Sequence, residues 1–207
     1  IWKQHGKNNA ILLGDLLIAK SFNIISNLEI SDSSKVVAVE LLSETISALV
    51  KGVFHEINED FKNQLDVNDA YIEMISQKTG KLIQFSSECL LGPSNVDHAT
   101  KSFLSDALMN FACAYQISDD FNDQNLNNAG SDISNNRPNI FTLLEPDNGE
   151  SQTEVIAVLQ KSFLKKANKS LALVPTPLSS AILEVLSPYV SFSKEGNSMK
   201  FDELLIK

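Results

Sequence analysis

The chain has 207 residues, a formal net charge of −9 and 43% hydrophobic residues, which is typical of a folded globular protein and excludes a disordered one. The length suits one domain, or at most two small ones, and the excess of 26 acidic over 17 basic side chains disfavours general affinity for nucleic acid or anionic membranes. No run of 18 apolar residues occurs, so we expect no transmembrane helix.

The first two predicted helices are long and apolar. Residues Asn9–Ile25 carry apolar side chains at helical spacing, on a face wide enough for a largely buried helix. After a break at Asp32 and Ser33, which are candidate N-cap residues, helical spacing returns over Lys35–Asn58. The apolar stripe expected along this second helix consists of Val36, Val39, Leu42, Ile46, Leu49, Val53 and Ile57.

Two more helices are predicted in the middle of the chain. Asp69 is a candidate cap for a helix over Tyr71–Leu91, which ends at a Gly-Pro-Ser turn over residues 92–94. A long helix follows from Asp97 to about Asp123. Its expected apolar side consists of Phe103, Leu104, Leu108, Phe111, Ala114, Tyr115 and Ile117.

The last third of the chain is more broken. The Asn-rich segment Asn125–Pro138 is typical of a loop, and a short apolar piece follows it. Two further helices are expected over Gln152–Leu173 and Leu178–Leu186, before a mixed surface segment over Phe192–Lys207. No strand of period two stands out. The sequence therefore predicts one all-α domain over residues 1–207, a bundle of long antiparallel helices.

The candidate chemistry lies in the segment YQISDDFND, which ends the long fourth helix. Asp119 and Asp123 are four residues apart and share one face of a helix, with Asp120 beside them. Three carboxylates repel one another, and the negative end of the helix dipole also disfavours them, so a cation is expected there. Oxygen ligands without a nearby His or Cys favour Mg²⁺.

A solvated acidic helix end is the alternative interpretation of the same three aspartates. The residues before them favour the metal site, because Phe111, Ala114 and Ile117 run directly into the carboxylates. This arrangement places the acids at the mouth of a buried apolar layer and not on an open face.

Four segments in order resemble the trans-isoprenyl (polyprenyl) diphosphate synthases, the family of farnesyl and geranylgeranyl diphosphate synthases. AILLGDLLIAKSF (Ala10–Phe22) resembles the family's A-x-L-x-G-D helix, and YIEMISQKTGKL (Tyr71–Leu82) resembles its Y-x-x-x-I-x-x-K-T helix. FACAYQISDDFND (Phe111–Asp123) resembles the second aspartate-rich motif, and GSDISNNRPNIFTLL (Gly130–Leu144) resembles the loop and helix that follow it.

The resemblance implies an all-α isoprenoid synthase fold and assigns roles to individual residues. Asp119, Asp120 and Asp123 match the aspartates that hold Mg²⁺ on the allylic diphosphate. The other matches are Lys78, Thr79 and Gln116 as catalytic residues, and Lys78, Gln116 and Arg137 as diphosphate-binding residues.

The reaction implied by the resemblance joins isopentenyl diphosphate to an allylic diphosphate and yields a linear polyprenyl diphosphate. Cations stabilise the departing pyrophosphate while an apolar cavity shields the carbocation. An acidic protein needs bridging metal ions and a few placed cations for this task. The resemblance also implies a homodimer.

Departures from the family pattern leave two alternatives open. The family's first aspartate-rich motif has no counterpart, because the alignment of segments places it before Ile1, and Asn128 stands near a position where the family has lysine. The family's N-terminal helices, which carry this motif, are therefore expected to be missing from residues 1–207. These 207 residues alone should not catalyse condensation. The alternatives are a non-catalytic or regulatory subunit that pairs with a catalytic homologue, and a related class I terpene synthase.

The two cysteines bear on location. Cys89 and Cys113 form neither a disulfide framework nor a zinc motif, which favours a reduced, cytoplasmic setting. The first residue is Ile and not Met, so an organelle-targeting segment that has been removed is compatible with the same sequence.

Overall fold

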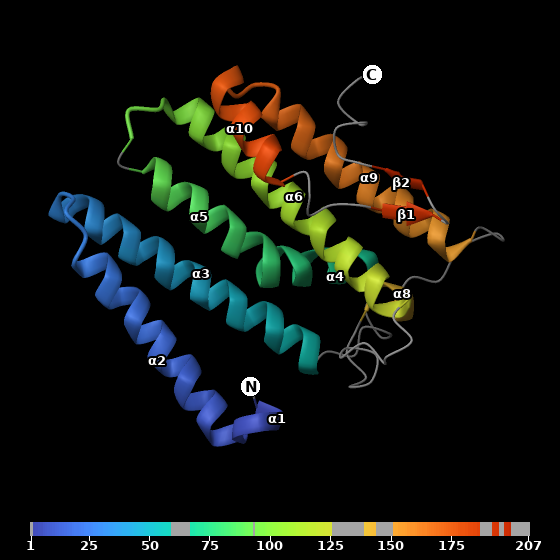
Figure 1. Cartoon of the computed structure of the whole chain (residues 1–207), viewed down its shortest axis with the longest axis horizontal. Coiled ribbons are helices and arrows are strands. Elements are labelled where there is room, and N and C mark those ends of the chain that lie inside the picture. Colours follow the sequence, from blue (N-terminus) through green and yellow to red (C-terminus); the bar gives the residue numbers. More distant parts are fainter. Residues whose placement is uncertain are drawn as a thin grey trace.

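The computed structural model describes residues 2–58, 67–92, 94–125, 139–143, 151–186, 192–194 and 197–199. These residues are almost entirely helical, which confirms the predicted all-α class (Figure 1). The helices are α1 (Trp2–His5), α2 (Lys7–Ser26), α3 (Asp32–Asn58), α4 (Val67–Ile75), α5 (Lys81–Leu91), α6 (His98–Asn125), α8 (Ile140–Leu143), α9 (Gln152–Leu171) and α10 (Thr176–Leu186), with a π-helical segment, η2 (Ser76–Gly80), between α4 and α5.

The long helices lie side by side in the order α2, α3, α5, α6 and α9, each contacting the next (Figure 1). Two of them begin at capped ends. The Asp97 carboxylate accepts the backbone N–H of Thr100 at 3.0 Å and so caps α6. The Ser31 hydroxyl accepts the backbone N–H of Ser34 at 3.2 Å, so the cap of α3 lies one residue before the predicted pair.

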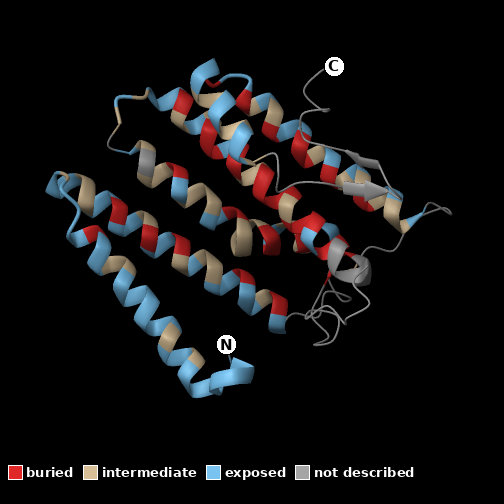
Figure 2. Cartoon of the chain, viewed as in Figure 1, coloured by how far each residue is buried: buried red, intermediate tan, exposed pale blue. Residues whose placement is uncertain are grey.

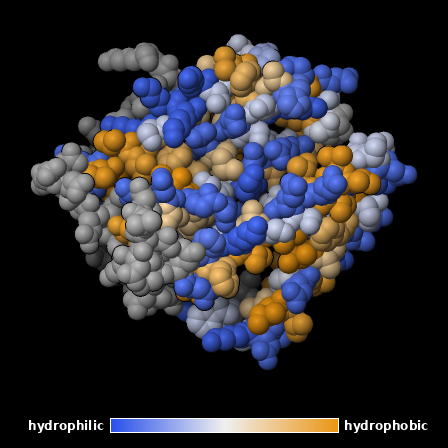
Figure 3. All heavy atoms as spheres, turned by 180° about the vertical axis from the view of Figure 1, so that it is seen from behind, coloured by the Kyte–Doolittle hydropathy of each residue, from blue (hydrophilic) through white to orange (hydrophobic). Residues whose placement is uncertain are grey.

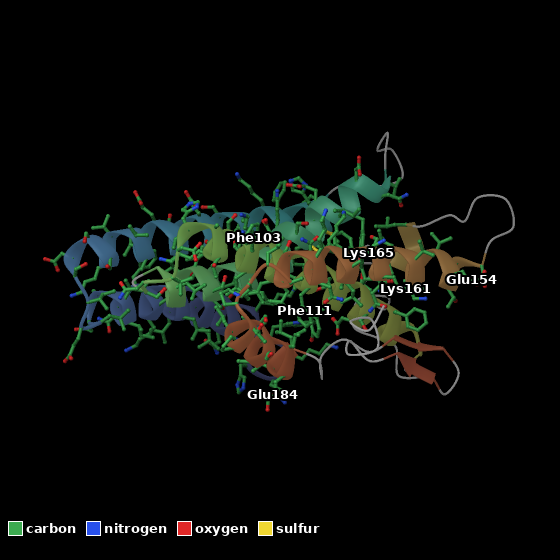
Figure 4. The ribbon with its side chains drawn as sticks, turned by 90° about the horizontal axis from the view of Figure 1, so that it is seen from above. Phe103, Phe111, Glu154, Lys161, Lys165 and Glu184 are labelled. Atoms are coloured by element: carbon green, nitrogen blue, oxygen red, sulfur yellow. The ribbon has the colours of Figure 1, made fainter. Side chains whose placement is uncertain are left out.

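The main core lies between α6 and α9, where buried residues are concentrated (Figure 2). Phe111 and Ile117 of α6 pack there with Ile156 and Phe163 of α9. Figure 4 labels Phe111 of α6, which is buried, and Lys161 of α9, which is exposed. The predicted apolar side of the long helix is thus confirmed, because its members from Leu104 onward are buried or half-buried.

Helix α2 corrects the expectation of a largely buried first helix. Of its residues only Ile25 is buried, and Leu12 and Leu16 are 64% and 52% exposed. Figures 1 and 2 show the reason, because α2 diverges from α3 toward its N-terminal end, where only short helices such as α1 lie beside it among the described residues. By length and composition α2 is apolar enough to cross a membrane. One such helix is weak evidence, since core helices and signal sequences meet the same test.

Helix α3 corrects the predicted stripe. Leu42 is buried as expected, but Val36, Val53 and Ile57 are 60%, 37% and 61% exposed. The face that packs inward is composed of small, polar and charged residues as well as Leu42. Its buried residues are Ala38, Leu42, Thr45, Gly52 and Glu56.

The predicted helix over Tyr71–Leu91 is divided into three parts. It begins at Val67, so Asp69 lies in its first turn and is not the cap. The π-helical segment η2 then interrupts it at Ser76–Gly80. Single π turns inside helices are rare and are frequent at functional sites.

A short antiparallel strand pair lies in the C-terminal segment, which the sequence predicts only as a mixed surface segment. Strand β1 (Phe192–Lys194) pairs with β2 (Asn197–Met199), with Phe192 opposite Met199. The predicted loop over residues 125–138 and Arg137 within it lie outside the described residues, apart from Asn125, which ends α6.

Candidate functional site

Most of the predicted site residues gather where three helical segments meet. Lys78 and Thr79 lie on η2, and Gln116, Asp119 and Asp120 lie in the second half of α6. Segment η2 packs directly against both α6 and α3. Asp123 lies in the last turns of α6 and its side chain is outside the described part of the chain, as is Arg137.

Three of these residues form one hydrogen-bonded chain from η2 to α6. The Thr79 hydroxyl donates to Gln116 Oε1 at 2.6 Å, and Gln116 Nε2 donates to Asp120 Oδ1 at 2.9 Å. Both ends of the Gln116 amide are therefore used by protein groups, and the residue is only 7% exposed. Gln116 fixes the relative position of Thr79 and Asp120 across the two segments.

Asp120 is the hub of this network. Its carboxylate also accepts the Tyr71 hydroxyl of α4 at 2.7 Å and the backbone N–H of Ile140 of α8 at 3.3 Å. Burial raises the pKa of Asp120 to about 6, and the hydrogen bonds from Gln116 and Tyr71 oppose that rise. Burial, followed by the Asp120 charge, raises the pKa of Tyr71 well above its usual value. One carboxylate thus ties α4, α6 and α8 together.

Asp119 and Asp120 occupy different environments although they are adjacent in sequence. Successive residues of a helix point about 100° apart, so only one of the pair faces the core. Asp119 is exposed and Asp120 is 6% exposed. Asp123 follows Asp119 by one turn, so its Cα lies on the same face of α6 as that of Asp119.

These positions fit a Mg²⁺ ion held by Asp119 and Asp123 better than one held by all three aspartates. Mg²⁺ commonly binds one or two carboxylates together with water and phosphate oxygens. Asp120 has three protein donors on its two oxygens, so Asp119 is the exposed candidate for an oxygen ligand. The described residues contain no group of three or more His, Cys, Asp or Glu that could hold a metal alone.

Lys78 forms a second, separate interaction at the same junction. Its Nζ lies 2.7 Å from Glu56 Oε1 of α3, whose side chain is 2% exposed, whereas the Lys78 side chain is 24% exposed. The ammonium is close enough to Asp120 to oppose the rise in the pKa of that carboxyl. A cation at the edge of an acidic cluster is suited to a phosphate ligand.

Segment η2 is held closely from both sides. On the α3 side, a Cβ added to Gly52 would lie 2.7 Å from the backbone N of Lys78. On the α6 side, a Cβ added to Gly80 would meet the thioether of Met109, and the Ser76 hydroxyl lies 3.5 Å from the Cys113 thiol. The backbone that carries Lys78 and Thr79 is therefore closely packed between α3 and α6.

Sequence reasoning missed three residues of this site. In the sequence Tyr71 stands out only as part of a motif, although a buried tyrosine needs a hydrogen-bond partner. Glu56 offered a signal, because it stands four residues after Gly52 and both share a helix face. Asn139, whose side chain donates to the backbone carbonyl of Asp120 at 3.2 Å, gave no signal in the sequence.

Sequence comparison relates this chain to known prenyl synthases. The profile of the family described as polyprenyl synthetase matches residues 1–174. A geranylfarnesyl diphosphate synthase of Natronomonas pharaonis is 28% identical over 159 residues, which are 72% of this chain and 45% of that protein. A short chain isoprenyl diphosphate synthase of Methanocaldococcus jannaschii is 29% identical over 117 residues, 56% of this chain and 35% of that protein. The chain thus covers less than half the length of these relatives.

Solved structures agree on the fold. A geranylgeranyl pyrophosphate synthetase from Pyrococcus horikoshii superposes with a TM-score of 0.75 at 23% identity, over 100% of this chain and 69% of that one. The enzyme of the same name from Geoglobus acetivorans gives a TM-score of 0.74 at 21% identity, with the same coverage. At these identities the likeness establishes the all-α fold.

Proposed function

Because this chain belongs to the polyprenyl synthetase family, we propose that the protein is a Mg²⁺-dependent prenyltransferase that joins isopentenyl diphosphate to an allylic diphosphate. One observation carries the proposal. The structure brings Lys78 and Thr79 of η2 to the aspartate end of α6, through the hydrogen-bonded chain from Thr79 to Gln116 and Asp120. Residues 78–79 and 116–120 lie far apart in the sequence, and they match the catalytic, diphosphate-binding and metal-binding residues that the family resemblance implies.

The reaction that we propose breaks the bond between the allylic carbon and the diphosphate oxygen, and that oxygen keeps the electron pair. The isopentenyl double bond then forms a new carbon–carbon bond to the allylic cation, and a proton is lost. Charge therefore develops on the departing diphosphate, and the half-buried Lys78 ammonium is placed to stabilise it. Thr79 shares the rigid η2 backbone with Lys78 and is oriented by Gln116.

Asp119 and Asp123 are the residues that we assign to Mg²⁺ binding. Bound there, Mg²⁺ would neutralise the diphosphate and act as a Lewis acid toward its oxygens. The protein contributes the exposed carboxylate of Asp119 at this end of α6, whereas the carboxylate of Asp120 is a buried hydrogen-bond acceptor. Apolar residues below it, including Ala114 and Ile117, exclude water from the base of the site.

A second copy of the chain is the partner that we propose for the exposed faces of α2 and α3. Large apolar side chains are exposed on both helices, and Figure 3 shows apolar surface in patches among polar side chains. Contiguous exposed apolar surface typically marks an interaction site. A bilayer is the less favourable occupant for α2, because Asp15 lies near the middle of that helix and a carboxylate at the bilayer centre costs about 3 kcal/mol. A cytoplasmic location is part of the same proposal, and both cysteines are free thiols.

The direct test supplies the full-length protein, together with any residues that precede Ile1, with Mg²⁺, labelled isopentenyl diphosphate and allylic primers of increasing length. We expect linear polyprenyl diphosphates, and no product when EDTA removes the metal. Lys78→Met should lower turnover by at least about a hundredfold because the developing charge loses its cation, whereas Lys81→Met, at an exposed lysine three residues away, should leave it unchanged.

Other outcomes identify the alternatives. Cyclic products without diphosphate would indicate a class I terpene synthase. Absence of turnover, with stimulation of a separate catalytic synthase that co-purifies with it, would indicate a regulatory subunit.

A further inference from the structure

The inward face of α3 ends in a charged residue that no part of the proposed chemistry uses. Glu56 lies in the last turns of α3, and its side chain is 2% exposed. A buried carboxylate is costly unless it is paired and hydrogen-bonded. The pairing group here is Lys78, at 2.7 Å, on a segment 22 residues away along the chain.

The pair leaves most of the Lys78 ammonium available. An ammonium has three N–H donors, and one of them is directed at Glu56. Lys78 is 24% exposed, so its remaining donors can reach a ligand in the solvent-facing part of the site. The Glu56 carboxylate is almost fully buried, and a ligand that drew Lys78 away would leave it as an unpaired buried charge. The pair is therefore expected to persist when a diphosphate binds.

Gly52 supports the same conclusion from the backbone. It precedes Glu56 by one helical turn, and the absence of a side chain lets α3 approach the backbone N of Lys78. The same face of α3 thus holds Lys78 at two points, with Gly52 against its backbone and Glu56 against its ammonium. An unrestrained lysine loses side-chain entropy when it is immobilised, and here that loss occurs on folding and not on ligand binding.

We propose that Glu56 is a positioning residue, which holds the Lys78 ammonium in place to receive a diphosphate oxygen. This proposal rests on the proposed function of Lys78. Glu56 acts through Lys78 and does not touch the ligand. Its effect on binding should therefore disappear when Lys78 is absent.

The test measures binding of inorganic pyrophosphate in excess Mg²⁺ by isothermal titration calorimetry. Glu56→Met keeps the length of the side chain but removes the acceptor, and we expect it to weaken binding about tenfold, as for loss of one charge-assisted hydrogen bond. Glu56→Gln keeps an acceptor at the same reach and should stay within about threefold of the native affinity. Glu40→Met, on the exposed side of the same helix, is the matched control and should have no effect.

A double-mutant cycle separates positioning from a general structural role. In the Lys78→Met background, Glu56→Met should change pyrophosphate affinity by less than about twofold. An equal loss in both backgrounds, or tighter binding by Glu56→Met alone, would overturn the proposal. If binding in the Lys78→Met background is too weak to measure, Glu56→Gln provides the decisive comparison. A pyrophosphate affinity of Glu56→Gln as low as that of Glu56→Met would contradict the proposal that a hydrogen-bond acceptor at residue 56 positions Lys78.

The remaining variants cover failure to fold and failure of the proposed function. Should Glu56→Met not fold, Glu56→Asp takes its place, because it keeps the charge but withdraws the carboxylate by one methylene. It should then lose affinity, and native affinity would contradict the proposal. If Lys78→Met alone leaves pyrophosphate affinity unchanged, the proposed function of Lys78 fails first. If Lys78→Met weakens binding and Glu56→Met does not, only the role of Glu56 fails.

Discussion

At the scale of single residues, the acidic end of α6 contains two carboxylates with different tasks. Asp119 is exposed, whereas Asp120 is buried and bonded to Tyr71, Gln116 and Ile140. The difference follows from the helix, because adjacent residues cannot face the same side. A cluster that looks uniform in the sequence therefore divides into a candidate metal ligand and an internal acceptor.

The pKa of Asp120 gives a pH-dependent prediction. Burial raises it to about 6, above the usual value of about 3.9, so between these pH values the folded protein holds a proton that the unfolded chain has lost. The free energy of unfolding that Asp120 contributes therefore falls as pH rises through this window. Without Mg²⁺, the stability of native protein relative to Asp120→Asn should fall by about 1 kcal/mol from about pH 5.2 to 7.5. Urea unfolding of both proteins at both pH values measures the difference in their free energies of unfolding. A stability advantage of the native protein that grows with pH would contradict the prediction.

Tyr71 gives a second prediction at this scale. Tyr71→Phe removes the 2.7 Å hydrogen bond to Asp120 and leaves a buried acceptor with fewer donors, so it should lower the free energy of unfolding by about 1–3 kcal/mol. Tyr115→Phe is the matched control, because the Tyr115 side chain is half-buried and its hydroxyl makes no hydrogen bond within the described part of the chain. That variant should change stability by less than about 0.5 kcal/mol. Equal losses in chemical denaturation would refute the role of the Tyr71 hydroxyl.

At the scale of the element, the π-helical segment η2 decides how the site is assembled. A continuous α-helix was predicted there, and local propensity gives no reason for an interruption at Ser76–Gly80. The structure packs this segment between Gly52 of α3 and Met109 of α6. The close approach on both sides needs residues without a side chain, which is what Gly52 and Gly80 provide.

Two glycine substitutions test this packing with the same chemical change. In Gly52→Ala the new methyl would meet the Lys78 backbone at 2.7 Å, so the helices must separate, and we expect a loss of about 1–3 kcal/mol in unfolding free energy. Gly14→Ala in α2 meets nothing within 4 Å, and should stabilise its helix by up to about 1 kcal/mol. Thermal unfolding of both variants gives the comparison. Equal changes would show that η2 is not tightly packed against α3.

At the scale of the whole molecule, the chain has one well-packed half and one open half. The α6–α9 core is buried, while α2 and the outer face of α3 expose large apolar side chains (Figure 2). The same open half contains a cavity of about 460 Å³ between α2, α3 and α5, lined by apolar residues that include Ile25, Leu42 and Phe85. Exposed apolar surface of this kind is typical of an interaction site.

The proposed homodimer predicts a specific change in mass. Leu12→Gln combined with Leu16→Gln places two amides on one face of α2, and should shift the protein from dimer to monomer in sedimentation equilibrium. Val158→Gln, at a residue 67% exposed on α9, is the control and should leave the dimer intact. Because each copy carries a net charge of −9, added salt should strengthen the association.

Two observations would count against the dimer of α2 and α3. A native protein that sediments as a monomer would exclude it. Pelleting of the native protein with lipid vesicles, lost in the double glutamine variant, would point to a membrane as the occupant of this face.

Periodicity in the sequence determined the helical class and the approximate end points of most helices. Short motifs, through their resemblance to a known family, predict that Lys78 and Thr79 act together with the aspartates. These features are local, since helical spacing, caps and short motifs depend on neighbouring residues. The tertiary structure alone decided which face of α3 turns inward, that Asp120 is internal, that η2 is π-helical and that Glu56 meets Lys78. Each of those outcomes depends on groups far apart in the chain, whose proximity is set by helix packing and by the need to pair every buried charge.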